Sequence, residues 1–413
     1  MDQSELFVLY NFIAYFVTFL IIYRIKGKSL GVYLLLLYTI CSLSSVLYVT
    51  NPLYKGFTLE TDMSLQPFIY LYLCLMILLW PSFRLKGDNI DISLSKQQTK
   101  RTGYIANVVI FMQLVCLLLL LPDIFRVFKS TDLGASREMV YGGADESPIT
   151  LLYNYKITKY FDLIVIGLKP YILLLGFYAA FINKNLRKKG RFFFWLTLMY
   201  SVMRSLVIVS RGEIVFLLLY LFFVILLFKK SINPQIYKKL VLFSTVAVGI
   251  FIPFFWAVSV SRFDDLANFF LFRYAGESMC NFNGNLFDQL KGTIDFNIYF
   301  PLFAIGQNFA FSNTLEKWDL IMKQSGVSGQ YFYTIIGGFL FCFGKVGTVL
   351  FCCLINRCYS LVTSFRFNSL SKILPLCLLS DMMIKGIFLF PLQGLTGNIE
   401  IVSLFVLMIL LRK

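Results

Sequence analysis

Apolar residues follow one another along almost the whole chain in stretches of about 17 to 25 residues, separated by polar segments. A stretch of that length fits a helix that crosses the hydrocarbon core of a bilayer. We predict about eleven such helices, over 6–23, 29–49, 67–83, 105–121, 163–182, 192–210, 212–228, 240–259, 331–355, 373–391 and 397–411. The pattern therefore indicates an all-α polytopic membrane protein that forms a single integral membrane domain over 1–413.

The polar segments between these stretches alternate in charge along the chain. Those after the first, third, fifth, seventh and ninth stretches, and the chain end, are basic and contain only Asp88 and Asp91 as acids. Cytoplasmic loops carry an excess of Lys and Arg, so the N-terminus is predicted outside and the C-terminus inside. Two long outer loops follow, 122–162 and 260–330, and loops of that length favour a functional role.

One apolar segment, 293–311, does not fit this alternation. It contains Asp295, Pro301 and Gln307, and a crossing here would invert the charge pattern of every later segment. We therefore predict a re-entrant or surface-lying helix over 293–311.

The composition supports a membrane protein and narrows its chemistry. The chain is 58% hydrophobic and 15% charged, with a mean hydropathy of +0.74. Its net charge of +16 follows the predicted topology, which favours contact with anionic lipid over nucleic acid. The chain has no histidine, which excludes His-based acid–base catalysis and most zinc sites. We expect neither a metal nor a cofactor.

The sequence R-S-L-V-I-V-S-R-G-E, 204–213, ends one apolar stretch and begins the next. Arg204 and Arg211 are seven residues apart, so they face the same way if the helix continues. A cation within a membrane segment is costly and marks a site by default, and guanidinium binds phosphate. We predict a phosphate site with Glu213 as base or orienting partner. Alternatively, Arg211 lies at the interface and pairs with Glu213.

A second cluster of charged and aromatic residues lies in the second outer loop, over 261–284. Arg262 and Arg273 are eleven residues apart, so one helix would present both on one face. Asp264 and Glu277 are carboxylates that would accept a hydroxyl proton, while the arginines would hold a phosphate. The alternative is an amphipathic helix on the membrane surface with solvated ion pairs.

Charged residues also lie within the predicted membrane helices. Asp381 and Lys385 are four apart, which predicts an ion pair within one helix. Lys169, Lys345 and Glu400 are further examples. A proton relay would also use such residues, so a transporter remains an alternative.

The span pattern, S-R-G-E at an outer hairpin, and S-R-F…R-Y-A-G-E-S…N-F-N-G in a long outer loop together resemble a bacterial family. This family is the Wzy-type oligosaccharide repeat-unit polymerases of O-antigen and capsule synthesis. The resemblance spans most of the chain and implies a fold of the GT-C type. It implies a metal-independent membrane glycosyltransferase in the inner membrane with its active site facing the periplasm. A growing glycan would be transferred from undecaprenyl diphosphate to a new lipid-linked repeat unit.

The resemblance also implies site residues and partners. The diphosphate-binding candidates are Arg204, Arg211, Arg262 and Arg273. The candidates that activate the acceptor hydroxyl are Glu213, Asp264 and Glu277. The implied partners are the lipid-linked glycans, the lipid bilayer, a chain-length regulator and a flippase. Two alternatives stay open, an O-antigen ligase and a lipid-linked glycan flippase or transporter. Ligases of this type generally carry a histidine in the large outer loop, and this chain has none.

Overall fold

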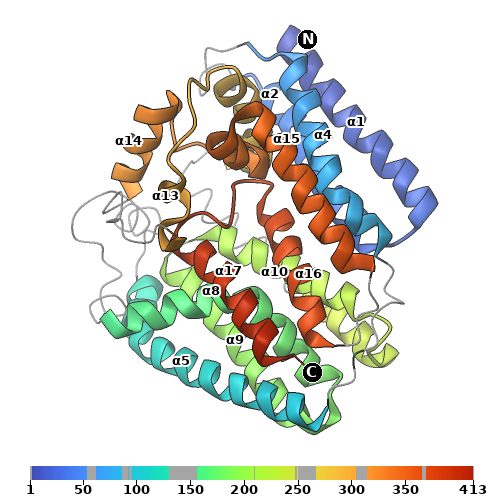
Figure 1. Ribbon diagram of the computed structural model, residues 1–413, viewed down its shortest axis with the longest axis vertical. Helices are drawn as coiled ribbons and strands as arrows, with labels where there is room; N and C mark the ends of the chain where they lie inside the picture. The colour runs from blue at the N-terminus through green and yellow to red at the C-terminus, as the bar shows by residue number, and fades with distance from the viewer. Residues whose placement is uncertain are drawn as a thin grey trace. The chain divides into compact units, whose positions relative to one another are not determined.

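The computed structural model describes residues 2–53, 62–85, 92, 95–129, 156–208, 210–246, 249, 267–303, 314–364 and 369–412. Every regular element in these ranges is helical (Figure 1). The α-helices are α1 Gln3–Lys26, α2 Leu30–Val49, α4 Leu65–Leu79, α5 Lys96–Lys129, α8 Lys156–Phe181, α9 Arg187–Val207, α10 Arg211–Leu227, α12 Ala267–Asn281, α13 Phe296–Tyr299, α14 Thr314–Ser325, α15 Thr334–Ser364, α16 Leu370–Lys385 and α17 Gly394–Leu410. Tighter or wider turns are the 3₁₀ segments η1 Trp80–Arg84, η3 Lys184–Leu186 and η6 Pro301–Phe303 and the π segment η5 Phe282–Phe287.

Several of these helices are long and apolar enough to cross a membrane. Within the described residues there are six, Gln3–Lys26, Leu30–Val49, Leu65–Arg84, Lys96–Phe125, Ile157–Phe181 and Thr334–Thr363. Two shorter apolar helices, Gly212–Leu227 and Gly394–Leu410, coincide with further predicted spans. The prediction of a helical membrane protein is thus confirmed, whereas the count of about eleven spans and their orientation stay predictions.

The prediction of a helix over 293–311 is wrong for 293–303, the part of this segment that the structure describes. Residues 293–303 contain only the four-residue α13 and the three-residue η6, and 304–311 lie outside the described residues. Phe300, between them, has φ −124° and ψ 57°, which is not helical. A residue before proline disfavours the α conformation, so Pro301 ends the helix that the apolar pattern suggested.

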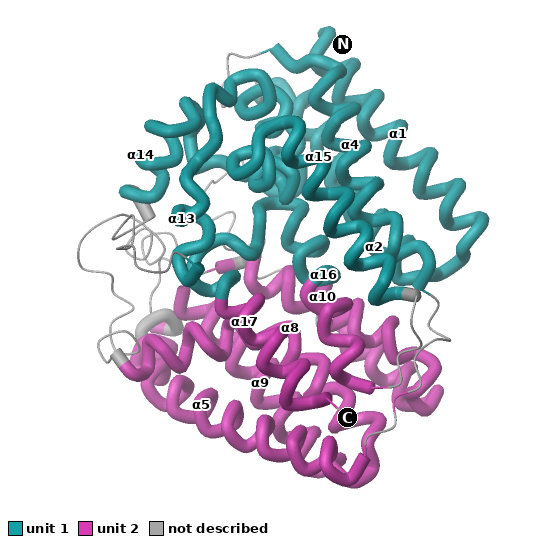
Figure 2. The backbone as a smooth tube through the Cα atoms, in the orientation of Figure 1, with its two compact units in different colours: residues 1–86, 266–365, 379–398 teal, residues 87–265, 366–378, 399–413 magenta. Residues whose placement is uncertain are grey.

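The chain divides into two compact units (Figure 2). Unit 1 comprises 1–86, 266–365 and 379–398, and unit 2 comprises 87–265, 366–378 and 399–413. The unit boundaries at 378/379 and 398/399 fall within helices α16 and α17. The two predicted outer loops are described only in part, because 130–155, 250–266 and 304–313 are among the residues left out of the description.

Each unit contains a helix crossing that only glycine permits. In unit 1, a Cβ on Gly276 of α12 would lie 2.4 Å from the backbone nitrogen of Ser45 in α2. In unit 2, a Cβ on Gly190 of α9 would lie 2.4 Å from the carbonyl carbon of Ala179 in α8. Small residues let helix backbones approach closely, which is how apolar helices associate in a membrane.

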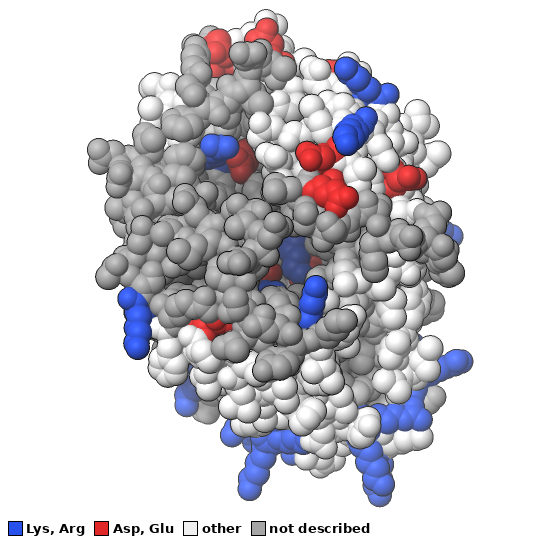
Figure 3. All heavy atoms as spheres, turned by 90° about the vertical axis from the view of Figure 1, so that its left-hand side faces the viewer, with Lys and Arg blue, Asp and Glu red and all other residues white. Residues whose placement is uncertain are grey.

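The basic segments of unit 2 meet at one end of its helices. The Gln98 side chain near the start of α5 donates to the Leu411 carbonyl after α17 at 3.0 Å. The Lys189 ammonium of α9 donates to the Gly103 carbonyl of α5 at 2.5 Å. On the face drawn in Figure 3, blue Lys and Arg side chains gather toward the lower end of the view. Segments that the charge pattern assigns to one membrane side therefore lie together.

Candidate functional site

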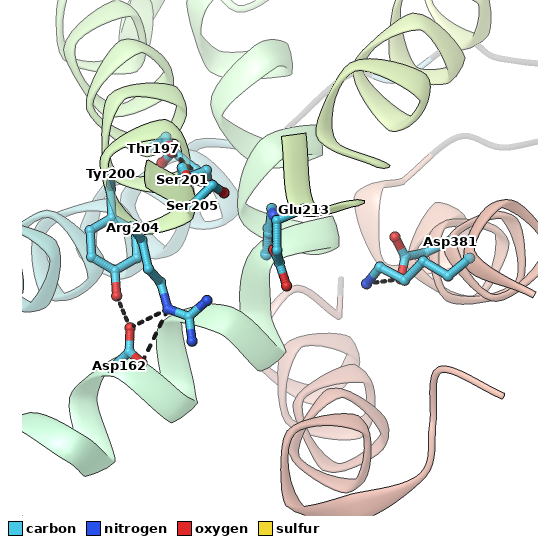
Figure 4. A network of polar contacts seen from close by, with 10 residues as sticks. Asp162, Thr197, Tyr200, Ser201, Arg204, Ser205, Glu213 and Asp381 are labelled. Atoms are coloured by element: carbon cyan, nitrogen blue, oxygen red, sulfur yellow. Dashed lines mark hydrogen bonds and ion pairs between the residues drawn. The ribbon is translucent and has the colours of Figure 1, made fainter. Parts of the chain in front are cut away.

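One face of α9 in unit 2 is lined with polar side chains, although the helix is otherwise largely apolar. Thr197, Tyr200, Ser201, Arg204 and Ser205 recur at spacings of three and four residues, which places them on the same side (Figure 4). The Ser201 and Ser205 hydroxyls each donate to the carbonyl four residues earlier, at 2.8 and 2.7 Å. The helix backbone thereby satisfies buried hydroxyls that water does not reach.

Arg204 is held by a carboxylate of α8. Its Nε donates to both oxygens of Asp162, at 3.0 and 3.2 Å, and the Tyr200 hydroxyl donates to the same carboxylate (Figure 4). The Asp162 side chain is 0% exposed, and that of Arg204 is 14% exposed. Because a buried carboxylate is costly unless it is paired and hydrogen-bonded, these contacts fix both the charge and the orientation of the guanidinium.

A second ion pair joins α8 to α10. Lys169 lies seven residues after Asp162, so both side chains are on one face of α8. The Lys169 ammonium lies 2.9 Å from Glu213 Oε2, and Glu213 is in the first turn of α10. The Lys169 side chain is 13% exposed and that of Glu213 is 34% exposed. Helix α8 is thus joined to α9 through its Asp162 carboxylate and to α10 through its Lys169 ammonium.

Three of these charged residues, Lys169, Arg204 and Glu213, face a small pocket in unit 2. It is lined by Gln113, Val165, Ile166, Lys169, Ile172, Thr197, Tyr200, Ser201, Arg204 and Glu213. Its free space is about that of one water molecule, so a larger anion enters only if a lining side chain moves aside. The pocket presents two cations, Lys169 and Arg204, each paired with a carboxylate.

Two of the predicted site residues, Arg204 and Glu213, line this pocket together. The continuous helix that would place Arg204 and Arg211 on a shared face is not present, because α9 ends at Val207 and a new helix begins at Arg211. The Arg211 side chain is outside the described part. The local pair of Arg211 and Glu213 lies outside the described side chains, whereas Glu213 binds Lys169 of α8.

The remaining candidates belong to the segment around α12 in unit 1. Arg262 and Asp264 lie outside the described residues. Arg273 Nε lies 2.8 Å from Glu277 Oε2, an ion pair one turn apart on α12. Burial raises the pKa of Glu277, and Arg273 opposes that change. A carboxyl group whose pKa is raised is better suited to proton transfer near neutral pH. Glu277 therefore remains a candidate for activating the acceptor hydroxyl.

The sequence predicts an outer loop for the segment that contains R-Y-A-G-E-S…N-F-N-G. In the structure this segment is helical and packs against other parts of unit 1. Gly276 permits the crossing with α2, and the Ser278 hydroxyl donates to the Ile387 carbonyl at 2.6 Å. The Asn283 side chain accepts from the Ser64 backbone at 3.0 Å and donates back to it at 2.6 Å. The alternative of an amphipathic surface helix is therefore wrong for 276–284, where every residue is buried by tertiary contacts.

The charged residues predicted within membrane helices have different surroundings. The predicted pair of Asp381 and Lys385 is confirmed at 2.5 Å. Lys345 follows the kink at Gly344 in α15 and pairs with Asp288 at 3.0 Å, with both side chains about half exposed. Glu400 is buried, 3% exposed, in α17. Each unit therefore contains a buried ionisable side chain, Asp381 in unit 1 and Glu400 in unit 2.

Sequence reasoning missed Asp162, Tyr200 and Gln113. The charge pattern places Asp162 at the end of the first long outer loop, 122–162, but α8 begins at Lys156. The sequence contains a sign of this polar face, since Tyr200 and Arg204 are one helical turn apart within a row of hydroxyl residues. The seven-residue spacing of Asp162 and Lys169 was a second signal.

Comparisons with protein-family models, curated proteins and solved structures give no match to this chain. Within the described residues, no three or more Cys, Asp or Glu side chains come together as a metal ion would require. The pocket in unit 2 is therefore interpreted from its own chemistry.

Proposed function

We propose that this protein is a membrane glycosyltransferase that polymerises oligosaccharide repeat units linked to undecaprenyl diphosphate. The observation that carries the proposal is the pocket of unit 2, where Arg204 and Lys169 are held by carboxylates among apolar helices. Ionisable groups in such surroundings are costly and mark a site for an ion or a charged substrate. A diphosphate has enough oxygens to pair with both cations, and it would occupy the site once the Glu213 side chain moves aside.

In the proposed reaction, an acceptor hydroxyl attacks the anomeric carbon of the growing glycan. The bond between that carbon and the diphosphate oxygen breaks, and its electron pair leaves with the undecaprenyl diphosphate. Arg204 stabilises the charge that develops on this leaving group. Glu213, the more exposed member of its ion pair, accepts the hydroxyl proton. Asp162 and Tyr200 act as positioning residues, because they hold the guanidinium of Arg204.

The proposal includes a bacterial inner membrane location with the pocket facing the periplasm. It also includes a chain-length regulator and a flippase as partners. Glu277, Asp264, Arg273, Arg262 and Arg211 remain further candidates for the same reaction.

A lipid-linked glycan flippase or transporter is the second candidate function. The buried ion pairs favour it, since transporters use intramembrane charges as relays. A flippase would move lipid-linked repeat units across the bilayer without joining them.

The test uses a deletion strain complemented with wild type, Arg204→Lys, Glu213→Gln or Arg187→Ala at matched protein levels. Arg187 is an exposed arginine at the other end of α9 and serves as the control. We expect long glycan ladders with wild type and Arg187→Ala. With Arg204→Lys and Glu213→Gln, we expect at least a tenfold loss of polymer. Long ladders in the uncomplemented deletion strain would rule out the polymerase. Failure of lipid-linked units to reach the outer leaflet would favour the flippase.

A further inference from the structure

We infer that Lys169 is a second diphosphate-binding residue, and that a prenyl diphosphate displaces Glu213 from it. This inference rests on the proposed function and deepens it. Lys169 would exchange one anion, the Glu213 carboxylate, for another, the diphosphate. In that exchange Glu213 is released at the moment when the substrate arrives.

The two ion pairs of the pocket differ in how firmly the carboxylate is held. Asp162 is 0% exposed and receives hydrogen bonds from both Arg204 and Tyr200. Glu213 is 34% exposed, and its lysine partner is 13% exposed. A half-buried carboxylate regains hydration when it leaves a pair, whereas a fully buried one loses its only stabilisation. Glu213 is therefore the carboxylate that can move.

The position of Lys169 suits an anionic ligand. Lys169 and Arg204 line the same pocket, so a ligand in it meets two cations. Glu213 stands in the first turn of α10, a helix of 17 residues whose N-terminus favours negative charge. A diphosphate that replaces Glu213 retains that favourable interaction and adds the pairing with Arg204.

The exchange would make diphosphate binding precede proton transfer to Glu213. While Glu213 is paired with Lys169, its Oε2 is engaged by the ammonium at 2.9 Å. Once the diphosphate occupies Lys169, that oxygen is released and can accept the proton of the acceptor hydroxyl. The new glycosidic bond forms as the bond to the diphosphate oxygen breaks, and the negative charge of the leaving group stays on Lys169 and Arg204.

Binding of farnesyl diphosphate to the purified full chain in lipid nanodiscs tests this inference. The variants are Lys169→Met, Glu213→Gln, the double variant, and Lys188→Met, a control at an exposed lysine of α9. We expect about tenfold weaker binding by Lys169→Met, as for loss of a hydrogen bond to a charged group. We expect several-fold tighter binding by Glu213→Gln, because the competing carboxylate is gone. The control should bind as wild type does.

Two further probes identify the ligand. Inorganic pyrophosphate that binds as tightly as farnesyl diphosphate, with the same dependence on Lys169, would overturn the assignment to a lipid-linked ligand. Farnesyl monophosphate should bind more weakly than the diphosphate, since it offers fewer oxygens to the two cations.

Glu213→Gln that binds no more tightly than wild type would overturn the exchange, and the ion pair would then be a structural brace. The double variant removes both members of the ion pair. Its binding therefore shows whether the effect of a single variant arises from misfolding. We expect it to bind as weakly as Lys169→Met. If the exchange is observed but the wild type makes no glycan ladders, the proposed polymerase fails and the binding site stands. If ladders depend on Arg204 while Lys169→Met binds normally, only this inference fails.

Discussion

At the scale of single residues, charges in this protein are tied to nearby partners of opposite sign. Arg204 is held by Asp162, which is 0% exposed, and Lys169 by Glu213. Breaking a buried pair by removing one partner costs about 3–5 kcal/mol, because the remaining charge is left without compensation. Substitutions at the pocket are therefore informative only when the charge balance is kept or controlled. For this reason Arg204→Lys is preferred to alanine, and Glu213→Gln is compared with the double variant that also lacks the Lys169 charge.

Lys317 of α14 is a lysine whose titration should affect stability. Its ammonium donates to Gln393 Oε1 at 3.1 Å and lies 5.1 Å from the centre of the Tyr299 ring. Burial lowers the pKa of Lys317 from 10.5 to about 8. Between these two values the unfolded chain binds more protons than the folded one. The contribution of Lys317 to the free energy of unfolding therefore rises with pH across this window.

We expect the melting temperature of wild type, relative to Lys317→Met, to increase by roughly 2 °C between pH 7.5 and 10. Thermal unfolding in detergent, followed by tryptophan fluorescence, measures the difference. Lys323→Met, on an exposed lysine of the same helix, is the control and should show a constant difference from wild type. A constant difference for Lys317→Met as well would contradict the prediction.

At the scale of elements, the crossing of α12 and α2 is the feature that most depends on one residue. The Ser45 hydroxyl donates to the Gly276 carbonyl at 2.8 Å, and any Cβ on Gly276 would meet the α2 backbone. We expect Gly276→Ala to destabilise the protein by about 1–3 kcal/mol, because backbone atoms cannot rotate away from the added methyl group.

The melting temperature of Gly276→Ala in detergent measures this effect. Gly103→Ala in α5 is the matched control, because a Cβ there would meet its nearest neighbours at 3.7 Å, an ordinary contact. We expect the control to melt as wild type does. Equal melting of Gly276→Ala and wild type would mean that the two helices do not cross at this glycine.

The sequence was sufficient for the long membrane helices and insufficient for α12 and for the partners of the ion pairs. A helix such as α2 is specified by twenty consecutive, mostly apolar residues, because backbone groups in a membrane must bond within their own segment. In contrast, α12 has 15 residues with Arg273 and Glu277 among them, and its burial depends on contacts with α2.

The partners in the pocket are distant in the sequence. Asp162 and Arg204 are 42 residues apart, and Lys169 and Glu213 are 44 residues apart. Charge and spacing identified Arg204 and Glu213 as candidates because they are local properties. The choice of Asp162 and Lys169 as their partners depends on how α8, α9 and α10 pack, which periodicity does not specify.

At the scale of the whole molecule, the charge alternation predicts the membrane side of each connection. Short loops rich in Lys and Arg stay in the cytoplasm, and the basic ends of α5, α9 and α17 lie together in unit 2. The pocket lies toward the other ends of α9 and α10, near the connection that contains Ser210. Its side of the membrane is therefore opposite to that of the basic ends if α9 crosses the bilayer.

A dual reporter of green fluorescent protein and alkaline phosphatase, fused after successive positions, tests this topology. We expect fluorescence for fusions after Lys28, Lys184 and Lys413, and phosphatase activity for fusions after Asn51 and Ser210. Insertion of the reporter into the full chain at the same positions controls for truncation. Fluorescence after both Lys184 and Ser210 would mean that α9 does not cross and that the pocket opens to the cytoplasm. In that case a reaction on periplasmic lipid-linked glycans would be ruled out, while binding of a prenyl diphosphate to Lys169 would remain testable.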